Sequence, residues 1–84
     1  MSKQIALEFP EEILSTLRED PKSFAKELKL TAAVKWYEMG KLSQERAAML
    51  AGLSRKEFIE ALARFNVSPV QYDVDEIKEE LSRA

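Results

Sequence analysis

The sequence contains no cysteine and no histidine among its 84 residues. Without cysteine, the chain can form neither a disulfide framework nor a thiolate metal site. Without histidine, it lacks the usual general base of enzymes and the commonest zinc ligand. The remaining hydroxyls, amines and carboxylates show no catalytic spacing. We therefore expect a protein that is not an enzyme and that needs no cofactor or metal.

The chain also lacks long apolar runs and a strong net charge. No stretch approaches the length that spans a bilayer, and no charged segment followed by an apolar run opens the chain. The formal net charge is −2, so the whole molecule does not attract nucleic acid electrostatically. We expect a cytoplasmic protein without membrane contact, whose binding to any nucleic acid depends on a local basic patch.

The length fits one small domain near the lower size limit for an independent core. The predicted fold class is mostly α, with a short N-terminal β-strand followed by a helical bundle that contains a helix-turn-helix. Within the single domain 1–84, we assign the strand and assembly helices to residues 1–40. The helix-turn-helix occupies residues 41–67, and residues 68–84 form an extended segment and an acidic C-terminal helix.

Residues 43–66 are the most informative stretch, because local chemistry and apolar spacing agree there. Gly52 can take the positive φ of a tight turn, and the small Ala48 lets two helices approach closely. Ser54 is the predicted N-cap of the second helix, and Glu57 three residues later completes a capping box. This pattern predicts a helix-turn-helix.

The second helix of this unit begins with basic side chains in a protein that is acidic overall. The N-terminus of a recognition helix meets base edges and phosphates, where arginine can fork onto guanine and lysine can neutralise phosphate. The alternative is an adaptor whose helix-turn-helix makes protein contacts and does not bind DNA. The residues predicted to contact operator DNA are Gln44, Ser54, Arg55, Lys56 and Arg64.

Residues 3–9 alternate in the manner of a half-buried strand, with Ile5, Leu7 and Phe9 on one face. A lone strand is not stable and needs a partner. We predict an antiparallel ribbon with a second copy, so that these three residues serve dimerisation. The alternative is a hairpin with residues 67–72 of the same chain.

Two helices are expected before the helix-turn-helix. The first follows Pro10 and ends near Arg18, and the second follows Asp20 and runs to Met39. Its wide apolar arc predicts a central helix packed on more than one side. The arc consists of two stripes, Phe24–Leu28–Ala32–Trp36–Met39 and Leu30–Val34–Tyr37.

Pro69 favours an extended segment after the helix-turn-helix, and Asp73 is placed to cap a last, acidic helix. The apolar face of this segment either folds back on the core or docks in the groove of a partner. Acidic helix starts are common for dipole reasons, so we assign no metal site here. The predicted partner-binding residues are Tyr72, Val74, Ile77 and Leu81.

The run AVKWYEMGKLSQERAAMLAGLSRKEFIEALARFNVSPVQYDVDEI resembles an uncharacterised family of small prokaryotic helix-turn-helix proteins. Members are often encoded beside PIN-like toxin genes and are described as candidate antitoxins. The likeness extends from about Ile5 to Leu81, and its most specific parts are residues 37–43, 47–54 and 67–72. It implies a protein that neutralises a partner nuclease and represses a shared promoter. It supplies no residue roles, so the site residues above rest on the sequence alone.

Overall fold

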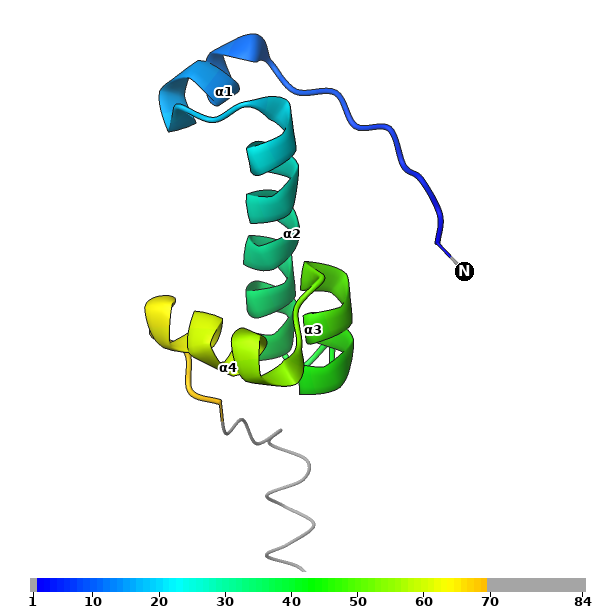
Figure 1. Ribbon diagram of the computed structural model, residues 1–84, viewed down its shortest axis with the longest axis vertical. Coiled ribbons are helices and arrows are strands. Elements are labelled where there is room, and N and C mark those ends of the chain that lie inside the picture. The colour runs from blue at the N-terminus through cyan, green and yellow to red at the C-terminus, as the bar shows by residue number, and fades with distance from the viewer. Residues whose placement is uncertain (1, 70–84) are drawn as a thin grey trace, which may run out of the picture.

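A computed structural model of the chain describes residues 2–69, and in that range it contains four helices and no strand. The long α2 forms the spine, α1 lies at its N-terminal end, and α3 and α4 pack at its other end (Figure 1). The prediction of a mostly helical chain is confirmed. The helices are α1 (Glu11–Leu17), α2 (Pro21–Glu38), α3 (Gln44–Ala51) and α4 (Arg55–Arg64).

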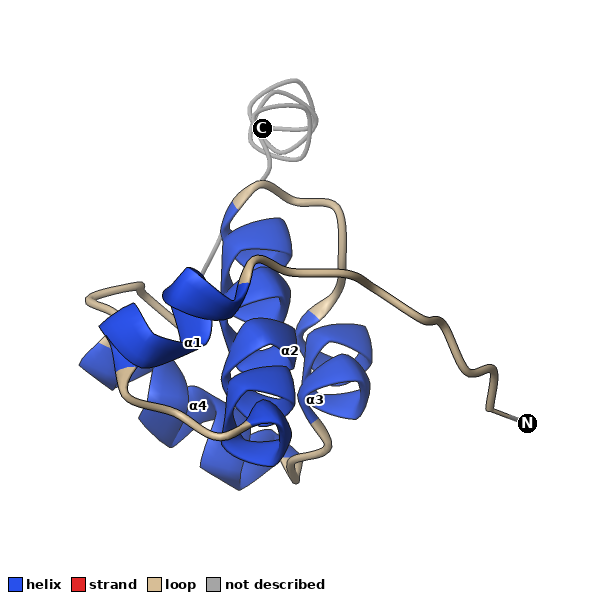
Figure 2. Cartoon of the chain, turned by 90° about the horizontal axis from the view of Figure 1, so that it is seen from above, coloured by secondary structure: helices blue, strands red, loops and turns tan. Residues whose placement is uncertain are grey.

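The predicted N-terminal strand is wrong, because residues 2–10 form no strand. This segment, the N-terminal arm, instead extends away from the start of α1 (Figures 1 and 2). Its contact with the helices is made by side chains: the rings of Phe9 and Phe24 meet edge to face, with centroids 4.8 Å apart. The alternation shows which side chains share a face. A strand also needs backbone hydrogen bonds with a neighbouring strand, and residues 2–69 contain no such strand. The ribbon across a dimer axis and the hairpin with 67–69 are therefore unsupported.

Local side-chain chemistry explains where α2, α3 and α4 begin. The side chains of Asp20, Ser43 and Ser54 each accept a hydrogen bond from the backbone N–H three residues later. Gly40 and Gly52 take positive φ values of 76° and 70° after α2 and α3, respectively. The predicted caps and turns of residues 20–54 are thus confirmed.

The core lies where α2, α3 and α4 meet. Phe58 and Leu62 of α4 are fully buried, and Val34 and Tyr37 of α2 belong to the same core cluster. The Tyr37 and Phe58 rings meet edge on, with centroids 5.9 Å apart. On α3 the core residues are alanines, whose small side chains let the helices pack closely.

In the described part of the chain, α2 packs on the core along one stripe and meets the arm through Phe24 of the other stripe. Of its two apolar stripes, the one through Leu30, Val34 and Tyr37 faces the core. The other stripe is exposed at Leu28, Trp36 and Met39. α3 packs beside the C-terminal half of α2 (Figure 1). The N-terminal half of α2 therefore has apolar side chains that the three-helix core does not use.

Candidate nucleic-acid interface

The α3–α4 unit has the geometry of a helix-turn-helix. α3 ends at Gly52, whose left-handed conformation turns the chain, and the Leu53 N–H donates to the Ala48 carbonyl at 3.0 Å. The chain then extends through Ser54, which caps α4. The predicted helix-turn-helix is therefore present, with α4 placed as its second helix.

Three of the predicted DNA contacts gather at one end of α4. Ser54 is the N-cap, and Arg55 and Lys56 are the first two helical residues, all with exposed side chains. Arg64 is the last residue of α4, about 13 Å away along the helix axis at 1.5 Å per residue. The partial positive charge of a helix N-terminus adds to Arg55 and Lys56, so this end of α4 is the electropositive one.

Gln44, the last of the predicted DNA contacts, is hydrogen-bonded to Arg55 across the turn. The Arg55 Nε–H donates to Gln44 Oε1 at 2.7 Å, and Gln44 Nε2 donates to the Pro69 carbonyl at 3.0 Å. Both ends of the Gln44 amide are thus engaged within the protein. The terminal guanidinium nitrogens of Arg55 have no partner among the described residues. Gln44 therefore fixes the position of Arg55 and leaves the outer edge of its guanidinium open.

Tyr37 is a second anchor of the same network, one that was not predicted from the sequence. Its hydroxyl donates to the Pro69 carbonyl at 2.7 Å and lies 3.4 Å from Gln44 Nε2. Val67 is buried beside it in the core. The segment that follows α4 is therefore held against α2 and α3. The sequence held one signal for this hydrogen bond: Tyr37 lies on an apolar stripe, and a buried tyrosine hydroxyl usually finds a partner.

Replacing Tyr37 by phenylalanine should test this anchor. Tyr37→Phe keeps the ring against Phe58 and removes the hydroxyl that donates to Pro69. We expect the free energy of unfolding to fall by about 1 kcal/mol, the usual net contribution of one hydrogen bond. Urea denaturation followed by circular dichroism measures this change. An unchanged midpoint would show that the anchor contributes nothing to stability.

One acidic residue, Glu57, lies in the first turn of α4 and partly offsets the positive charge of Arg55 and Lys56. The Ser54 backbone N–H donates to the Glu57 carboxylate at 2.9 Å, and this bond holds the pKa of Glu57 below its ordinary value. Glu60 and Arg64 lie four residues apart on α4 but form no ion pair within residues 2–69. The ion pair found in residues 2–69 joins Lys35 to Glu38 at 2.8 Å. Arg64 is therefore not neutralised by Glu60.

The lowered pKa of Glu57 predicts a pH dependence of stability. A carboxyl group whose pKa is lower in the folded state stabilises the fold above its unfolded pKa and loses that effect as the pH falls through its folded pKa. We expect the wild type to be more stable than Glu57→Gln at pH 7. The difference should shrink as the pH falls below about 4.5, the ordinary pKa of glutamate. Thermal melts of both proteins at several pH values measure it, and a constant difference would contradict it.

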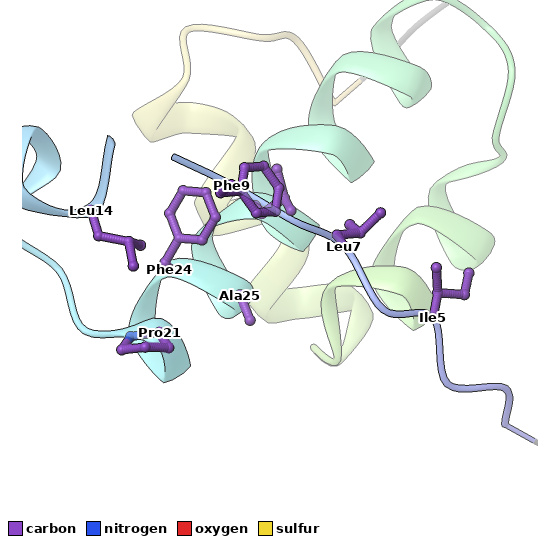
Figure 3. A pocket seen from close by; sticks show the side chains of 8 residues that line it. Ile5, Leu7, Phe9, Leu14, Pro21, Phe24 and Ala25 are labelled. Carbon is purple, nitrogen blue, oxygen red and sulfur yellow. The ribbon is translucent and has the colours of Figure 1, made fainter. Parts of the chain in front are cut away.

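The predicted dimerisation residues lie away from α4. Ile5, Leu7 and Phe9 line an open apolar groove together with residues of α1 and α2 (Figure 3). The predicted partner-binding residues Tyr72, Val74, Ile77 and Leu81 lie outside the described residues. Among residues 2–69, no helix combines the length and the apolar character that crossing a membrane requires.

Comparison with known proteins agrees with the family resemblance seen in the sequence. A protein of Aeropyrum pernix, named UPF0175 protein, is 39% identical over 83 residues, which cover 99% of this chain and 88% of that protein. A UPF0175 protein of Archaeoglobus fulgidus is 38% identical over 77 residues, which cover 92% and 85% of the two chains. No solved structure matches significantly. Since the match to the family extends over residues 1–84, the chain belongs to the uncharacterised protein family UPF0175.

Proposed function

We propose that this protein is an antitoxin-like regulator that binds operator DNA through the N-terminal end of α4. In this proposal Arg55 reads a base edge in the major groove and Lys56 neutralises a phosphate. Ser54 lies beside them at the cap, and Arg64 contacts the DNA backbone from the far end of α4. Gln44 acts through Arg55 and does not contact DNA by itself.

The observation that supports this proposal most is the hydrogen bond between Arg55 and Gln44. An exposed arginine normally samples many rotamers, and ordering it on binding costs free energy. The 2.7 Å bond across the turn holds this arginine at the helix end before any ligand arrives. Its terminal nitrogens stay available for the bidentate contact that guanine offers.

Binding to DNA from the upstream region of the chain's own gene tests the proposal. Fluorescence anisotropy should show tighter binding to this fragment than to a scrambled fragment of equal length. The affinity should also fall when the salt concentration is raised from 50 to about 200 mM, because phosphate contacts release counterions. Equal affinity for both fragments, or no binding at the lower salt concentration, would overturn the proposal.

We further propose that the protein acts in the cytoplasm and that residues 72–81 bind a partner of the PIN-like toxin class. The support is the apolar spacing of Tyr72, Val74, Ile77 and Leu81 and the resemblance to candidate antitoxins. Co-expression with the product of a neighbouring PIN-like gene should give a complex that co-purifies. An Ile77→Asp variant should lose the complex while keeping its affinity for DNA.

A protein-interaction adaptor is the second candidate function. It is favoured by the exposed carboxylates of Glu57 and Glu60 on α4 and by the net charge of −2. An adaptor would bind the protein partner and show no affinity for DNA at any salt concentration. The anisotropy titration therefore distinguishes the two candidates.

A further inference from the structure

The N-terminal part of the molecule combines an open apolar groove with an apolar ridge of its own. The groove has a volume of about 380 Å³. It lies between the arm, α1 and the start of α2 (Figure 3). The residues that line it are Ile5, Leu7, Phe9, Leu14, Pro21, Phe24, Ala25 and Leu28.

The ridge consists of Ile13 and Leu17, one helical turn apart on α1. Neither side chain lines the groove, and Leu17 is 49% exposed. Side chains at i and i+4 lie on one face of a helix, so the two form a single apolar projection. The groove residues Ile5 and Leu7 are 79% and 62% exposed, which leaves the groove open to receive such a projection.

We propose that two copies of the chain associate here, with the ridge of each copy seated in the groove of the other. A twofold axis brings the same surfaces together twice, so a surface with both a projection and a groove complements itself. The contact is made by side chains and requires no strand pairing between the arms. It is independent of the proposed binding to DNA.

The exposed apolar side chains can supply a large part of the area that such a dimer buries. The exposed fractions of Ile5, Leu7, Phe9, Ile13, Leu17 and Leu28 add up to about three whole side chains. At about 200 Å² for each large side chain, this is on the order of 600 Å² per copy. Specific interfaces bury about 800 Å² per partner. The neighbouring backbone and polar side chains have to supply only the remainder.

The charges beside the two surfaces also favour a second copy. Glu11 and Glu12 lie in the first turn of α1, and Lys22 and Lys29 directly follow the groove residues Pro21 and Leu28 along α2. None of the four forms an ion pair within the described residues. When α1 of one copy enters the groove of the other, Glu11 and Glu12 of the first copy approach Lys22 and Lys29 on α2 of the second. Charge complementarity of this kind favours association in the correct register.

Sedimentation equilibrium of the full chain over a range of concentrations tests the proposal. We expect a dimer, and we expect Leu17→Glu and Leu28→Glu each to raise its Kd at least roughly tenfold, since a twofold interface loses the side chain twice. Met49→Glu, an equally drastic change at an exposed methionine of α3, should leave the Kd unchanged. Circular dichroism checks that each variant is folded. A monomeric wild type, or a dimer that resists both variants, would overturn the proposal.

The absence of cysteine allows a second test, in which the two surfaces are cross-linked. A mixture of Leu17→Cys and Ala25→Cys chains should form a mixed disulfide faster than a mixture of Met49→Cys and Ala25→Cys chains. The first pair joins the ridge to the groove, and the second pair does not. Equal rates would contradict the docking of α1 in the groove even if the protein is a dimer.

Discussion

Replacing Phe58 by alanine is expected to remove a large part of the stability of the fold. Phe58 is fully buried between α2, α3 and α4, and Phe→Ala changes in protein cores cost about 3–5 kcal/mol. A chain of this size has a total stability of roughly 4–12 kcal/mol at 0.05–0.15 kcal/mol per residue. The thermal midpoint should therefore fall by at least about 12 °C, since 1 kcal/mol corresponds to about 4–8 °C in a small domain.

Phe65→Ala is the matched control, because Phe65 follows α4 and is 39% exposed. The same atoms are deleted, but a side chain that keeps much of its solvent contact leaves a smaller cavity. Its midpoint should fall by less than half as much as that of Phe58→Ala. Equal effects of the two variants, measured by circular dichroism, would show that the core is not centred on α4.

The second large effect is expected on DNA binding. Arg55→Ala, Lys56→Ala removes the guanidinium that Gln44 orients and the neighbouring ammonium group. An arginine that makes a bidentate contact with a base contributes about 1–3 kcal/mol. The double variant should therefore bind the upstream fragment at least roughly 5- to 140-fold more weakly, by the tenfold change that accompanies each 1.4 kcal/mol. It should also lose much of its preference over scrambled DNA.

The control variant removes two lysines that lie away from α4. Lys3→Ala, Lys26→Ala changes the net charge by the same amount at exposed positions of the arm and α2. A general electrostatic attraction would weaken equally in both double variants, whereas contact through α4 weakens in only one of them. Equal losses would therefore contradict a specific role of Arg55 and Lys56.

The sequence predicted the helix-turn-helix well because its information there is local. A serine cap, a glutamate three residues later and a glycine in a tight turn act within one or two helical turns. Ser54, Glu57 and Gly52 accordingly lie where their chemistry requires. The buried residues Phe58, Ala61 and Leu62 likewise recur at the spacing of one helix face.

The conformation of the N-terminal arm and the hydrogen bonds to the Pro69 carbonyl could not be predicted in this way. The alternation of Ile5, Leu7 and Phe9 is compatible with a strand, but a strand depends on a partner that local pattern does not reveal. The bonds from Tyr37 and Gln44 to Pro69 join residues 32 and 25 positions apart. Such contacts arise only after α2, α3 and α4 have packed. Sequence spacing therefore identified Gln44 but did not reveal its hydrogen bonds with Arg55 and Pro69.

Mapping of amide chemical shifts tests the central claim, DNA binding by α4, most directly. The isotope-labelled chain is titrated with its own upstream DNA, and the shifts of all assigned amides are followed. The proposal predicts that the largest changes occur at Ser54, Arg55 and Lys56, with smaller changes at Gln44 and little change in α1. Shifts that remain unchanged in α4, or that change mainly in α1 and the arm, would contradict it.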